Sequence, residues 1–89
     1  MDSTDKRQRA KELGDVVKAA RLARKVRPVS LSVVSGVSIA ALYAIERGDT
    51  RNPSLLTLNA LWRTLEIPAE VLARLTNRTP EEITGGVQP

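Results

Sequence analysis

The sequence contains no cysteine, no histidine and no phenylalanine among its 89 residues. Without cysteine there is no disulfide scaffold, thiolate zinc site or thiol nucleophile, and without histidine the commonest transition-metal ligand and neutral-pH acid–base group are missing. Paired carboxylates with catalytic spacing and a glycine-rich phosphate loop are also lacking. The composition disfavours an enzyme, and we expect no metal, no cofactor and no small-molecule ligand.

Long hydrophobic runs are lacking as well. The longest uncharged stretch, residues 28–45, includes several serines and Gly36 and is too polar and too short for a bilayer span. The charged N-terminus is not followed by a signal-peptide core. We therefore expect one small cytoplasmic domain with no membrane partner.

Aromatic residues are scarce: Tyr43 and Trp62 are the only two. The core must be built from Leu, Val, Ile and Ala, which favours an all-α fold. The formal net charge is +4, and residues 1–27 contain nine Lys or Arg against four acids. A positive field at this end suits a polyanion such as nucleic acid, although a solvated helix of mixed charge is the simpler explanation of the same residues.

Hydrophobic spacings of three and four predict five helices. We expect one from the capping residues at 2–5 to the break at 25–28, one over 28–35, one over 38–47, one carrying the apolar face at 55–65, and one over 68–76. Residues 1–12 are mostly polar and are expected to form an extension of the first helix. Residues 77–89 are expected to be a flexible tail.

Residues 29–33 alternate between apolar and polar side chains, as a half-buried strand does. Ser35 and Gly36 could then form the turn of a hairpin that pairs this segment with residues 37–39. An isolated hairpin needs further strands, which the Ala- and Leu-rich remainder does not offer. The helical interpretation explains more residues. In it, Pro28 opens a helix, Gly36 takes a left-handed turn and Ser38 caps the next helix.

Two short helices joined through a glycine turn match the helix-turn-helix unit, whose second helix enters the major groove of DNA. Four short stretches carry a resemblance to the Xre or lambda-repressor-like (Cro/CI-type) family: Leu13-Gly14 with Val17 and Arg21, Gly36-Val37-Ser38, Ile45-Glu46-Arg47-Gly48, and Pro53-Ser54-Leu55 followed by Leu58, Leu61, Leu65 and Ile67. The likeness covers roughly residues 13–75. The chain departs from the family pattern at Pro28-Val29-Ser30, where Gln or Glu is common, and at Ser35, where an apolar residue usually precedes the turn.

The resemblance implies a five-helix, lambda-repressor-like DNA-binding domain over residues 13–76. The implied function is sequence-specific binding of double-stranded DNA by a transcriptional regulator, acting as a homodimer on a two-fold related operator. Because little of the chain lies beyond this domain, we expect a Cro-like phage or mobile-element repressor or an antitoxin-like one, in the bacterial nucleoid or a phage-infected host. The alternative is a protein-interaction module that has lost DNA binding.

The resemblance also implies a partly buried ion pair between Arg21 and Glu46. On the predicted recognition helix, the face opposite the core would meet the bases with Ser38, Ile39, Ala40, Tyr43, Ala44 and Arg47. Arg27, Arg51 and Asn52 are placed for phosphates. The face has no Gln, Asn or Lys. What remains is contact with thymine methyls, the Tyr43 hydroxyl, and Arg47 reaching a phosphate or a guanine, so specificity would lean on DNA shape.

Trp62 and the apolar residues of the fifth predicted helix suggest a self-complementary surface for the dimer. The residues concerned are Trp62, Val71, Leu72 and Leu75. For Trp62, packing in the core is the alternative that we leave open.

Overall fold

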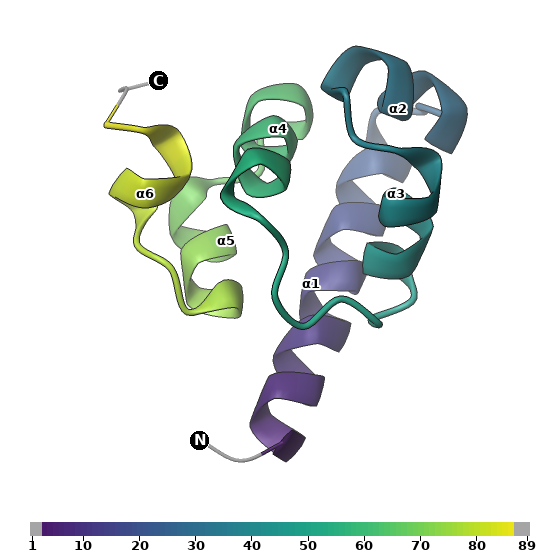
Figure 1. Cartoon of the computed structure of the whole chain (residues 1–89). Coiled ribbons are helices and arrows are strands. Elements are labelled where there is room, and N and C mark those ends of the chain that lie inside the picture. The colour runs from purple at the N-terminus through teal and green to yellow at the C-terminus, as the bar shows by residue number, and fades with distance from the viewer. Residues whose placement is uncertain (1–2, 87–89) are drawn as a thin grey trace.

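Residues 3–86, the part of the chain that the computed structural model describes, form six α-helices and no strand (Figure 1). The helices are α1 (Ser3–Ala23), α2 (Pro28–Ser35), α3 (Ile39–Glu46), α4 (Leu55–Leu65), α5 (Ala69–Thr76) and α6 (Pro80–Thr84). The predicted all-α fold is confirmed. The hairpin alternative for residues 29–39 is wrong, because residues 28–35 are helical.

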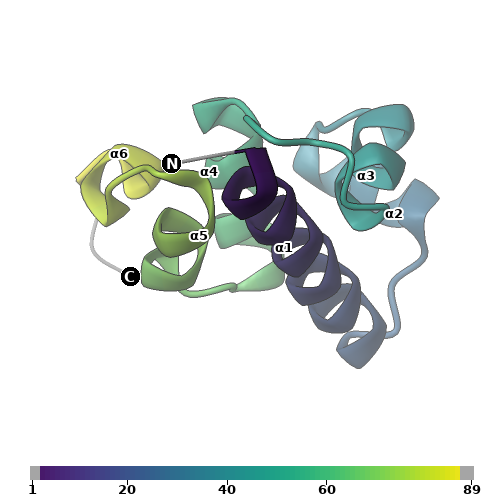
Figure 2. The ribbon, with the colours of Figure 1, turned by 90° about the horizontal axis from the view of Figure 1, so that it is seen from below.

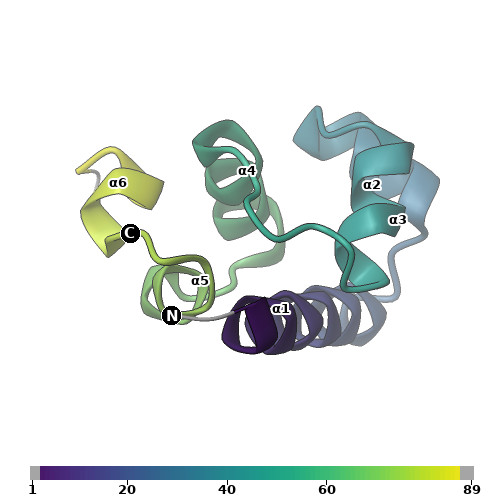
Figure 3. The same cartoon turned by 60° about the horizontal axis from the view of Figure 1, so that its bottom comes forward.

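The long helix α1 supports the rest of the molecule. Its 21 residues correspond to about 31 Å of helix, close to the longest molecular dimension of 35 Å. Figure 3 shows α1 and α5 on one side, with α2, α3, α4 and α6 covering the other. α1 packs against α3, α4 and α5. Within the predicted extension, residues 3–12 are a continuous part of α1, and Ala10 is buried. Residues 1–2 lie outside the described residues.

The two helices of the predicted helix-turn-helix begin and end where local backbone chemistry places them. Pro28 occupies the first turn of α2, where its missing N–H costs nothing. Gly36 has φ of 77°, a left-handed conformation that ends α2. The Ser38 side chain accepts a hydrogen bond from the Ala41 N–H and so caps α3.

The axes of α2 and α3 are bent by 118° relative to each other. Within residues 3–86, no single helix is long and apolar enough to cross a membrane. The α2–α3 pair passes that test on combined length and composition only, across this bend.

Aliphatic side chains from all six helices fill one core. The largest fully buried ones are Leu13, Val17, Leu31, Leu42, Ile45, Leu58, Leu61, Leu72 and Ile83. Neither aromatic residue is among them. Leu42 and Ile45 point inward from α3, so the opposite face of that helix is turned to solvent.

The helix α6 corrects our expectation of five helices and a flexible segment from residue 77. Thr79 and Glu82 form a reciprocal capping box at its beginning, and Ile83 is fully buried against α4 and α5. The Asn59 side chain donates a hydrogen bond to the Ile83 carbonyl at 2.9 Å. One apolar side chain is enough because α4 and α5 together offer a site for it. Residues 87–89 lie outside the described residues.

Gly14 allows α1 to approach the end of α3 more closely than any other residue would permit. A Cβ atom at this position would lie 2.9 Å from the Glu46 carbonyl oxygen and closer still to that of Ile45. Both neighbours are backbone atoms, which cannot rotate away. The contact between α1 and α3 therefore depends on the absence of a side chain here.

We predict that Gly14→Ala lowers the free energy of unfolding by about 1–3 kcal/mol, because the methyl group must push α3 away. In an ordinary helix interior, Gly→Ala raises the free energy of unfolding by about 0.5–1 kcal/mol. The sign of the change therefore shows whether the close contact at Gly14 exists. Urea unfolding measures the effect. The exposed Ala19→Gly on the same helix calibrates helix propensity, and a stabilised Gly14→Ala protein would contradict the close contact.

Candidate nucleic-acid interface

Arg21 and Glu46 form a bidentate ion pair between α1 and the end of α3. Arg21 Nε donates to Glu46 Oε2 at 2.7 Å and Nη2 donates to Oε1 at 3.0 Å. The two side chains are 10% and 9% exposed, so the pair is shielded from water. Nη1 also donates to the Val26 carbonyl at 2.9 Å, which ties the α1–α2 connection to the same guanidinium.

Hydrogen bonding to Glu46 raises the pKa of Arg21 above its ordinary value, against the opposing effect of burial. The guanidinium therefore remains charged whenever the protein is folded. Glu46 lies at the C-terminal end of α3, where the helix dipole disfavours an anion. Arg21 compensates for this and fixes the position of α3 on α1.

Two serines, Ser32 and Ser35, hold the turn between α2 and α3 through hydrogen bonds. The Ser32 hydroxyl donates to the Val37 carbonyl at 2.6 Å, and the Ser35 hydroxyl accepts from the Val37 N–H at 3.1 Å. Val37 itself is buried. Ser35 thus replaces the usual apolar residue before the glycine with a hydrogen bond that stiffens the turn.

The solvent-facing side of α3 carries the residues that we predicted to meet DNA. Ser38, Ala40, Tyr43 and Arg47 are exposed, with Tyr43 at 45%, whereas Ile39 and Ala44 are half-buried. The face is a shallow apolar surface with one hydroxyl near its middle and one guanidinium at its end. Such a surface can contact thymine methyl groups and donate a few hydrogen bonds.

Polar and cationic residues are exposed in the segments that precede α2 and follow α3. Arg51 and Asn52 are exposed in the segment between α3 and α4, and Arg27 is exposed immediately before α2. Arg27 makes no side-chain cap at the beginning of α2, where backbone N–H groups and the helix dipole favour an anion. Arg47 Nε donates to Asp49 Oδ2 at 2.9 Å, an exposed pair that a phosphate could replace.

A further cation, Arg24, has structural partners at the end of α4. Arg24 pairs with Glu66, and its Nε donates to the Leu65 carbonyl at 3.2 Å. These contacts join the end of α1 to the end of α4. Lys18 and Lys25 are exposed.

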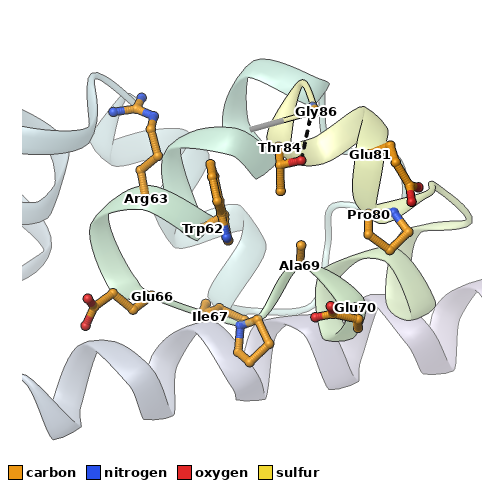
Figure 4. Close-up of a pocket in the computed structure, with 11 residues that line it drawn as sticks. Trp62, Arg63, Glu66, Ile67, Ala69, Glu70, Pro80, Glu81, Thr84 and Gly86 are labelled. Atoms are coloured by element: carbon orange, nitrogen blue, oxygen red, sulfur yellow. Dashed lines mark hydrogen bonds between the residues drawn. The ribbon is translucent and has the colours of Figure 1, made fainter. Parts of the chain in front are cut away.

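A hollow of about 740 Å³ lies between the end of α4, the beginning of α5 and α6, and Trp62 forms one of its walls (Figure 4). Its charged lining residues are Arg63, Glu66, Glu70 and Glu81. This excess of carboxylates disfavours phosphates.

The structure also corrects the surface that we expected to form the dimer. Leu72 and Leu75 are buried in the core beneath α1 and are not available to a partner. Trp62 and Val71 are only partly buried, and both pack against that core. Half of the expected surface is therefore interior.

Comparison with known families gives a match over residues 17–72 to the model described as helix-turn-helix. The match covers well over half of the chain, and the protein belongs to this family, the Cro/CI-type, Xre-like helix-turn-helix proteins. These are DNA-binding transcriptional regulators, and DNA binding is the function of the domain. Comparisons with curated proteins and with solved structures gave no significant match.

We predict that Arg21→Ala and Glu46→Ala are strongly non-additive. Either change alone leaves a charge without its partner in a shielded place, so a double-mutant cycle in urea unfolding should give about 1–3 kcal/mol of coupling. Arg21→Lys should not restore stability, because an ammonium cannot donate in the same fork.

The exposed pair of Glu12 and Arg74 is the matched control. It also joins α1 to another helix, but at 3.6 Å and with both side chains about half exposed or more. Its coupling should stay below about 1 kcal/mol. Equal coupling in the two cycles would mean that the Arg21–Glu46 pair has no special role.

Proposed function

We propose that the protein is a sequence-specific regulator that binds double-stranded DNA through the exposed face of α3 and represses transcription by occupying its operator. The observation that carries this proposal is that α3 is held rigidly with that face exposed to solvent. Arg21 fixes α3 to α1, and Ser32 and Ser35 stiffen the α2–α3 turn. Arg27 and Arg51 are exposed in the segments just before α2 and after α3. The repressor would be of the Cro-like or antitoxin-like kind, working in the cytoplasm where its DNA is.

The chemistry of the α3 face supports an uncommon mode of reading. Ser38, Ile39, Ala40, Tyr43, Ala44 and Arg47 are the residues that we assign to it. No side chain among them can form the bidentate amide contact to adenine, so discrimination rests on methyl contacts, groove shape and any contact of Arg47 to guanine. Arg27, Arg51 and Asn52 would bind phosphates and set the register.

The alternative function is a protein-interaction module in which the same apolar face docks a partner. Exposed Tyr43 and half-buried Ile39 are compatible with this reading. The two functions differ in their dependence on salt. Phosphate contacts release counterions and give a steep decrease of affinity with ionic strength, whereas an apolar interface does not.

We further propose that a homodimer binds a two-fold related operator. Support comes from the partly exposed Trp62 beside the hollow, since the other expected interface residues of α5 are interior. Light scattering should give a dimer mass on the operator, and Trp62→Ala should weaken dimer formation without unfolding the protein. A monomer on DNA at high micromolar concentration would contradict the dimer.

We predict that two classes of variant separate. Arg47→Ala and Arg51→Ala should weaken binding to all sequences and flatten the salt slope by about one unit per lost phosphate contact. Ile39→Ala and Tyr43→Ala should instead change which bases are preferred. Fluorescence anisotropy with operator and random duplexes, at several salt concentrations, measures both.

Replacing a contacted thymine by uracil sharpens this test. If Ile39 contacts the thymine methyl, uracil should weaken binding of the wild-type protein but make little difference to Ile39→Ala, because the same contact is already lost. Folded Ile39→Ala and Tyr43→Ala proteins with unaltered base preference would defeat the proposal and favour the partner-docking alternative.

A further inference from the structure

A second hollow, of about 440 Å³, lies between the beginning of α1, the α3–α4 connection and the end of α5. The residues that line it are Lys6, Arg9, Arg51, Asn52, Leu75, Thr76 and Asn77. We call it the basic cleft. Figure 2, seen from below, shows the connection from α3 to α4 passing beside the N-terminal part of α1.

The charged side chains that line the basic cleft are all positive. Three of its residues are cations, two are amides that can donate hydrogen bonds, and none is acidic. The hollow beside Trp62 has the opposite balance, with three glutamates and one arginine. Guanidinium, ammonium and amide donors around one cleft suit a phosphate group.

The sequence positions of these residues show how the cleft is assembled. Lys6 and Arg9 are three apart on α1 and therefore lie on one face of the helix. They precede the part of the chain that the helix-turn-helix family model matches, and Asn77 follows it. Only Arg51 and Asn52 fall inside that match. The cleft is thus an addition that the extended α1 makes to the family domain.

The location of the cleft identifies the phosphate. Arg51 and Asn52 follow α3 by only a few residues, so a duplex seated on α3 passes close to them. Lys6 lines the same cleft as Arg51 and Asn52 and is exposed. Any phosphate that reaches Arg51 therefore also enters the positive field of Lys6.

We infer that the basic cleft binds the sugar-phosphate backbone of the duplex whose bases α3 reads, with Lys6 supplying a phosphate contact beyond the helix-turn-helix unit. This inference rests on the proposed function. Under this inference, the polar N-terminal part of α1 increases the number of DNA phosphates that the protein contacts. The ligand is the phosphodiester of the bound duplex, and free inorganic phosphate is the rival source of the same chemistry.

The test compares Lys6→Gln with Arg7→Gln. Both remove one positive charge from the same turn of α1 and both residues are exposed, but Arg7 does not line the cleft. Affinity for the operator duplex is measured against salt concentration, with unfolding curves to confirm that both variants are folded. We expect Lys6→Gln to flatten the log–log salt slope by about 0.9, the value for one phosphate, and Arg7→Gln to leave it unchanged.

A methylphosphonate scan, which neutralises one phosphate at a time, identifies the position contacted. At one outer position the neutral linkage should weaken wild type but not Lys6→Gln. Equal slopes for the two variants, with wild type binding normally, would overturn the inference alone. So would a Lys6→Gln protein that loses affinity for inorganic phosphate but not for DNA. A wild-type protein with no affinity for any duplex would refute the proposed function as well.

Discussion

The orientation of α3 depends on its attachment to α1. Arg21 and Glu46 supply the attraction in a bidentate, largely buried pair, and Gly14 supplies the space for the two backbones to meet. The two contacts are complementary, since the pair would stretch if Gly14 carried a side chain, and the close approach would lose its anchor without Arg21. An ion pair shielded from water costs desolvation energy, so its value lies more in fixing one geometry than in adding stability.

This fixed geometry has a consequence for recognition. In the proposed complex, an α3 face without amide side chains reads DNA mainly through methyl contacts and shape, and such contacts are short-ranged and sensitive to small displacements. A rigid helix is therefore more important here than in a protein that reads bases by long, adaptable side chains. The cations around the face act over longer distances, because Coulomb interactions decay slowly within a Debye length. In the proposed complex, the contacts of the α3 face supply the specificity and the surrounding cations supply most of the affinity.

Local chemistry explains which parts of this structure were predictable. Pro28 and Gly36 determine helix ends through their backbone conformations and Ser38 through its capping side chain, so the helix-turn-helix could be placed from sequence. The Arg21–Glu46 pair spans 25 positions and was reached only through family resemblance. The helix α6 was missed because its stability rests on one residue, Ile83, whose site is built by α4 and α5. The basic cleft joins Lys6, Arg51 and Asn77, and no local pattern brings such distant residues together.

The most direct test of the account is a map of backbone amide chemical shifts in the ¹⁵N-labelled protein during titration with a duplex selected from bound genomic DNA. The account predicts the largest changes over residues 36–52, further changes near Lys6, and little change around Trp62 and α6. Changes concentrated around Trp62 and α6, with α3 unaffected, would contradict it.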